Sequence, residues 1–171
     1  MDNYAEIKKS IKKCESNIVI TGLGVLVFGL WTVLKFIIQT MYGDNGIGVT
    51  LDEIKNSSDI APEVIPVVVF SYVIVISAVI MACHCYVGFK AIGYGRGIRK
   101  KWGFLIFAGI LAIMTAWGIP FYFIPKDGYL NKGDTVIAAA LVDITLFYIF
   151  MDMIVSAIRL NYYKRKLERE Q

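Results

Sequence analysis

The sequence predicts an all-α polytopic membrane protein, with four transmembrane helices in an antiparallel bundle and both termini cytoplasmic. The first observation is composition: 57% of the 171 residues are hydrophobic and only 19% are charged, whereas soluble domains average about 45–50% apolar residues. The second is clustering, because the apolar residues form four stretches of about 22–25 residues, and a spanning helix needs about 20. Together these observations exclude a soluble enzyme and a disulfide-stabilised scaffold.

Four spans follow from those stretches, at about 17–42, 62–87, 102–124 and 135–160. The first apolar run is longer than the core of a signal peptide, which has about 7–15 residues, so we expect a retained helix. Pro120 lacks a backbone donor and predicts a kink near the end of the third span, and Pro125 predicts its end. We expect residues 1–171 to form a single transmembrane domain.

The orientation is predicted from lysine and arginine, which accumulate in the cytoplasmic segments of membrane proteins. Fourteen of them lie in the N-terminal tail, the loop between the second and third spans, and the C-terminal end, against three in the other two loops. We therefore expect both termini and the loop between the second and third spans in the cytoplasm. The predicted location is the cell (inner) membrane, crossed four times.

Two polar segments flank the spans. In the N-terminal segment, 3–16, Ile7, Ile11 and Cys14 recur at helical spacing opposite four lysines, a pattern typical of an amphipathic helix in the membrane interface. We expect this segment to lie along the inner membrane surface and then to turn into the first span. The C-terminal segment, 161–171, is expected to be a basic tail.

Polar groups inside a bilayer are costly, so candidate functional residues are sought among them. Those of the first and fourth spans fall on one helical stripe each, which indicates that both faces turn to the bundle interior; the stripes are Asn17, Thr21, Thr32, Lys35 and Gln39, and Thr145, Tyr148, Asp152, Ser156 and Arg159. Lys35 and Asp143 are expected at the same depth, because each stands about five residues to the outer side of the centre of its span. On neighbouring antiparallel helices they would form an ion pair, which offsets a cost of about 2.5–3.5 kcal/mol for each charge alone at the centre of the membrane. The alternative is that Lys35 extends towards the outer interface and Asp143 is protonated or hydrated.

Asp152 is the second carboxylate of the fourth span. It follows Asp143 by nine residues, which is two and a half helical turns, so one helix cannot direct both carboxylates to the same site. Two interpretations of Asp152 stay open. One is a hydrogen bond to a Ser, Thr or Tyr of a neighbouring helix, with Arg159 one heptad further along. The other is a proton- or cation-responsive carboxylate that lines a cavity.

The run Cys83-His84-Cys85 does not predict a metal site. Adjacent residues of a helix point about 100° apart, and zinc motifs leave at least two residues between paired cysteines. We therefore expect no metal and no cofactor. His84 is expected to be a hydrogen-bonded residue at a helix interface.

The loop between the second and third spans is expected to contact lipid headgroups. It combines glycines with five cationic side chains and with Tyr94 and Trp102, a composition suited to anionic lipids at the cytoplasmic face. The cationic residues are Lys90, Arg96, Arg99, Lys100 and Lys101. The alternative is that these cations serve only to fix the topology.

The same loop carries a resemblance to a known pattern. The positions concerned are Tyr86-Val87-Gly88, Ala91, Gly95-Arg96-Gly97 and Lys100-Lys101. They resemble the end of the second span and the Gly- and Lys-rich cytoplasmic turn in an uncharacterised family of small four-span bacterial integral membrane proteins, which has no known activity. The N-terminal KKSxxKCxxNI, leading into a Gly-rich first span, is similar to the same proteins. The resemblance covers about 40 residues and implies a bacterial inner-membrane origin, with no implied activity.

The sequence contains no recognisable catalytic motif, and this absence guides the expected class of function. The sequence holds no Ser-His-Asp arrangement, paired-carboxylate site, HExxH motif or phosphate loop, so we expect no enzyme. We expect a non-enzymatic accessory, sensory or assembly component, and the alternative is a small oligomeric channel or transporter subunit that uses intramembrane carboxylates. The expected partners are the lipid bilayer, anionic lipids at the cytoplasmic face, and either a second copy of the chain or another membrane protein, but no nucleic acid.

Overall fold

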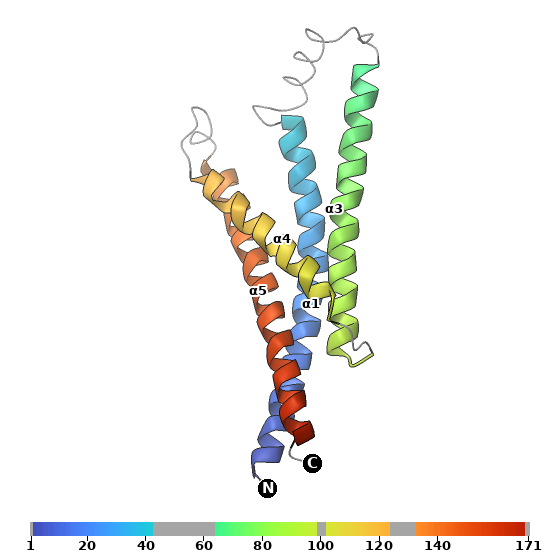
Figure 1. Ribbon diagram of the computed structural model, residues 1–171. Helices are drawn as coiled ribbons and strands as arrows, with labels where there is room; N and C mark the ends of the chain where they lie inside the picture. The colour runs from blue at the N-terminus through green and yellow to red at the C-terminus, as the bar shows by residue number, and fades with distance from the viewer. Residues whose placement is uncertain (1, 43–63, 99–101, 124–132, 170–171) are drawn as a thin grey trace. The chain divides into compact units, whose positions relative to one another are not determined.

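The structure is a computed structural model that describes residues 2–42, 64–98, 102–123 and 133–169, and all regular structure in these ranges is helical (Figure 1). Four helices are long and apolar enough to cross a membrane, which confirms the predicted all-helical, multi-pass architecture at this level. The elements are α1 (Asp2–Tyr42), α3 (Ile65–Gly95), α4 (Phe104–Gly118), the short 3₁₀-helix η1 (Ile119–Tyr122) and α5 (Gly133–Arg169).

Two of the helices are much longer than a bilayer requires. α1 has 41 residues and α5 has 37, which correspond to about 62 and 56 Å at 1.5 Å per residue, against about 30 Å for the hydrocarbon core. The predicted spans 17–42 and 135–160 are therefore the apolar parts of longer helices. Similarly, α3 continues past the predicted span 62–87 to Gly95. Lys, Arg and Glu are good helix formers, so a helix does not have to end where its hydrophobic stretch ends.

The N-terminal segment differs from our expectation. α1 is continuous from Asp2 to Tyr42, so the expected turn between the amphipathic segment and the first span is absent. Ile7, Ile11 and Cys14 are buried in the same apolar cluster as Leu160 of α5. The apolar face of this segment thus packs on the C-terminal part of α5. Correspondingly, α5 remains helical through most of the segment predicted to be a tail.

The described chain divides into two compact units. The first contains residues 1–28 and 85–171, and the second contains residues 29–84, so α1 and α3 each contribute to both. The core of the first unit is a single apolar cluster, and its largest fully buried side chains are Ile18, Val25, Val87, Phe104, Leu146, Phe150, Met153 and Leu160. α4 ends at Gly118 and gives way to η1, which is the interruption predicted at Pro120. Pro125 lies outside the described residues.

Within the first unit, α1 and α3 come very close at two glycines. A methyl group added to Gly88 would lie 2.9 Å from the carbonyl oxygen of Gly22 and 2.6 Å from Cγ of Leu26. Small residues at such crossings let the helix backbones approach, and this close packing drives helix association where lipid removes the hydrophobic driving force. The two glycines therefore fix how closely these parts of α1 and α3 pack.

Candidate functional site

Three polar side chains of α1 and α5 form a hydrogen-bonded cluster, which we call the Asn17 cluster. The side-chain amide of Asn17 donates to Oδ2 of Asp152 over 2.8 Å and to Oγ of Ser156 over 2.9 Å. The hydroxyl of Thr21 donates to the carbonyl oxygen of Asn17, one turn earlier, over 2.9 Å. Ser156 and Thr21 are buried. A single amide thus satisfies two acceptors of a neighbouring helix, which is favourable where water is excluded.

The second carboxylate of α5 has a partner on a different element. Asp143 is only 4% exposed, and the hydroxyl of Tyr122, in η1, donates to its Oδ2 over 2.6 Å. That length lies in the range of a hydrogen bond from a hydroxyl to a carboxylate. Asp143 bonds to η1 and Asp152 bonds to α1, so the two carboxylates make separate contacts. This agrees with their positions on opposite faces of α5, nine residues apart.

The other predicted polar residues occupy different places. Lys35 is half-buried on α1 in the second unit, whereas Asp143 belongs to the first, and their ion pair stays a prediction. Arg159 is exposed on α5, one heptad after Asp152. Neither Lys35 nor Arg159 belongs to the Asn17 cluster as its hydrogen bonds define it.

His84 is a packed residue of the second unit. It is buried, and its Nδ1 lies 2.9 Å from the carbonyl oxygen of Ile80, one turn earlier, so this nitrogen is the donor. A Cβ added to Gly29 would lie 2.6 Å from Cβ of His84, so α1 and α3 are in close contact there. Cys83 and Cys85, on either side, are free thiols. Among the described residues, no three His, Cys, Asp or Glu side chains are grouped so as to hold a metal ion.

Two of the five predicted lipid-contacting cations are described. Lys90 lies inside α3, and its Nζ is 5.5 Å from the centroid of the Tyr86 ring. Arg96 directly follows the last residue of α3 and is exposed. Arg99, Lys100 and Lys101 lie outside the described residues.

The first unit also contains an apolar groove of about 690 Å³ between α4 and α5. Its lining includes Gly109, Ala112 and Ala116 of α4 together with Phe147 and Met151 of α5. No charged side chain is among its lining residues. A hollow of this kind accommodates apolar groups and offers no hydrated route for an ion.

The sequence places one residue of these contacts, Asn17, on a polar stripe of the first span that is expected to face the bundle interior, but it does not single out Tyr122. Tyr122 belongs to no motif, although its place two residues after Pro120 puts it in the interrupted end of the third span. Asn17 lies at the start of the first span on the same helical stripe as Thr21, but its partners on α5 are 135 and 139 residues away in the chain. A single sequence carries no signal for a contact of that separation.

No protein-family model, curated protein or solved structure matches this chain.

Proposed function

We propose that this protein is a non-enzymatic integral membrane protein of the cell (inner) membrane, which acts as an accessory, sensory or assembly component through contacts with a membrane partner. The observation that carries the proposal is the use of its intramembrane polar groups. Asn17 donates to both Asp152 and Ser156, and Tyr122 donates to Asp143. Polar side chains engaged between helices hold a bundle together. Polar groups with a structural role of this kind are expected in a protein that acts by binding a membrane partner and not by catalysis.

An antiparallel bundle with both termini in the cytoplasm is part of the same proposal. In the first unit the start of α1 contacts the end of α5, through the Asn17 cluster and through an ion pair of 3.0 Å between Glu15 and Lys164. The end of α3 reaches the same level, since a methyl group on Gly95 would lie 2.8 Å from the carbonyl oxygen of Glu15. Three cation-rich segments therefore gather at one end of this unit, which supports placing them on one side of the membrane.

The alternative function is a small oligomeric channel or transporter subunit. The observation in its favour is that Asp152 is only half-buried, so this residue is partly accessible to a second subunit. The apolar lining of the groove between α4 and α5 argues against a conducting route there.

Reconstitution into liposomes distinguishes the accessory function from the channel or transporter function. The full-length protein in liposomes is expected to leave ion and proton gradients unchanged over a range of protein-to-lipid ratios. The contrary result is a flux that Asp152→Asn abolishes and that Ser71→Ala, a change at an exposed hydroxyl of α3, leaves intact. Such a flux would replace the accessory function by the channel or transporter function.

A further inference from the structure

We propose that the C-terminal part of α3 and the start of α4 bind one anionic phospholipid. In this site Lys90 contacts the phosphate of the headgroup, and one acyl chain lies along the rings of Tyr86 and Phe107. The proposal is independent of the accessory function proposed above.

This part of the chain carries positive charge without carboxylates of its own. Residues 64–125 contain five cationic side chains and not one Asp or Glu. Glu15, whose backbone packs against Gly95, has its carboxylate paired with Lys164. By contrast, the cations of α1 and α5 are interspersed with carboxylates of their own segments. A phospholipid headgroup supplies the missing negative charge at the depth where a spanning helix leaves the hydrocarbon.

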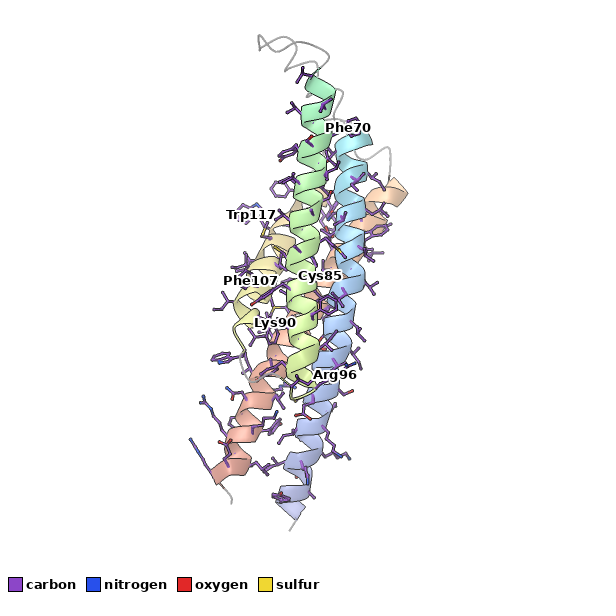
Figure 2. All side chains as sticks on the ribbon, turned by 90° about the vertical axis from the view of Figure 1, so that its right-hand side faces the viewer. Phe70, Cys85, Lys90, Arg96, Phe107 and Trp117 are labelled. Atoms are coloured by element: carbon purple, nitrogen blue, oxygen red, sulfur yellow. The ribbon has the colours of Figure 1, made fainter. Side chains whose placement is uncertain are left out.

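The geometry at Lys90 combines a cation with an apolar ledge from two helices. Nζ of Lys90 lies over the ring of Tyr86, and the Tyr86 ring meets that of Phe107 edge to face, with 5.1 Å between ring centroids. The rings remain accessible, since Tyr86 is 42% exposed and Phe107 47% exposed. Figure 2 shows Phe107 above Lys90, nearer to the N-terminal end of α3. The order from acyl chain to headgroup is therefore reproduced by aromatic ring and then ammonium group.

The helical stripe that carries Lys90 ends at a glycine, close to the end of α3. Tyr86, Lys90 and Gly93 fall on one helical stripe, and Gly93 adds no side chain there. α3 then ends in a Schellman motif: the amide of Ile98 donates to the carbonyl of Gly93 over 3.0 Å, and Gly97 takes a positive φ of 73°. The chain thus turns away directly after the stripe.

Arg96 provides a matched comparison on the same element. Its amide still makes a helical hydrogen bond to Ile92, and six residues place it about 120° around the helix from Lys90. Arg96 is therefore a cation at the same end of α3 that lacks the aromatic ledge. A diffuse attraction to anionic membranes would involve both cations, whereas a discrete site involves Lys90 far more than Arg96.

The test is native mass spectrometry of the full-length protein in detergent, titrated with phosphatidylglycerol or with phosphatidylcholine of the same acyl chains. Phosphatidylglycerol is expected to bind more tightly. Lys90→Gln is expected to weaken its binding about fivefold, the factor that corresponds to about 1 kcal/mol per cation near a membrane. Arg96→Gln is expected to weaken binding less than twofold, and Lys90→Arg to restore it. Phe107→Ala is expected to weaken the binding of both lipids, because both use the ledge.

Several outcomes would overturn the site. Equal losses for Lys90→Gln and Arg96→Gln indicate diffuse attraction. Equal binding of the two lipids excludes recognition of the headgroup charge. Displacement of phosphatidylglycerol by inorganic phosphate in the 10 mM range, with Phe107→Ala silent, indicates a site for a free anion and not for a lipid. Thermal unfolding of each variant separates loss of binding from loss of fold, and Lys90→Arg provides the folded, charge-retaining reference.

Discussion

Asn17 shows how one side chain can organise a contact between two helices. An amide has two donors, and here both go to acceptors of α5, the carboxylate of Asp152 and the hydroxyl of Ser156. A leucine in its place would leave both acceptors without this donor in a low-dielectric setting, which is the expensive case. The contribution of Asn17 to stability depends on two partners on α5 that the sequence around Asn17 does not reveal.

We therefore expect Asn17→Leu to destabilise the protein by about 1–2 kcal/mol, the upper part of the range for interhelical hydrogen bonds in membranes. Denaturant-induced unfolding in mixed micelles measures the loss. Ser16→Ala, an exposed neighbour, is the control and is expected to change stability by less than about 0.5 kcal/mol. In a double-mutant cycle Asn17→Leu with Asp152→Leu should cost less than the sum of the single changes. Simple additivity would contradict the coupling.

At the scale of elements, the sequence predicted the number and kind of helices well and their surroundings less well. Four apolar stretches sufficed for four helices, and Pro120 sufficed for the interruption before η1. The pattern of Ile7, Ile11 and Cys14 shows only that one face is apolar, and a bilayer surface and a neighbouring helix satisfy it equally. In the structure this apolar face packs against α5. Hydropathy marks where a helix leaves the membrane but not where it ends, which explains why α3 runs on to Gly95.

The packing of α1 on α5 outside the predicted spans can be tested at Ile11. Ile11 is buried, whereas its neighbour Lys12 is exposed. Ile11→Asn places a polar group in the apolar cluster and is expected to cost about 2–4 kcal/mol, while Lys12→Asn is expected to have little effect. In a background with Cys83→Ala and Cys85→Ala, Ile11→Asn should also raise the rate at which a maleimide labels the buried thiol of Cys14. If both substitutions leave that rate unchanged, the segment does not pack on α5.

For the molecule as a whole, its exposed apolar surface requires a lipid environment. Within the most hydrophobic windows of the four helices only 17–28% of residues are buried inside the protein, although these windows hold most of its hydrophobic side chains. In water so large an apolar surface would drive aggregation, whereas in a bilayer lipid covers it at no such cost. The polar contacts at Asn17 and Tyr122 then have a disproportionate role, because apolar burial alone does not hold helices together in lipid.

The orientation of the whole molecule gives the last prediction. Lysine and arginine number fourteen in the three segments expected inside and three in the two expected outside, and the first unit brings the ends of α1, α3 and α5 to one level through Glu15, Lys164 and Gly95. Green fluorescent protein fused after Gln171 or inserted after Gly97 should therefore fluoresce, since it folds in the cytoplasm. Alkaline phosphatase fused at the same positions should be inactive, and fused after Lys55 it should be active.

Replacing Lys8, Lys9, Lys12 and Lys13 with glutamine is expected to weaken the preference for this orientation without inverting it, because ten cations remain on the same side. Activity of the phosphatase after Gln171 in the unaltered chain would contradict the orientation. Disagreement between the reporters at Gly97 and Gln171 would contradict an even number of spans between them.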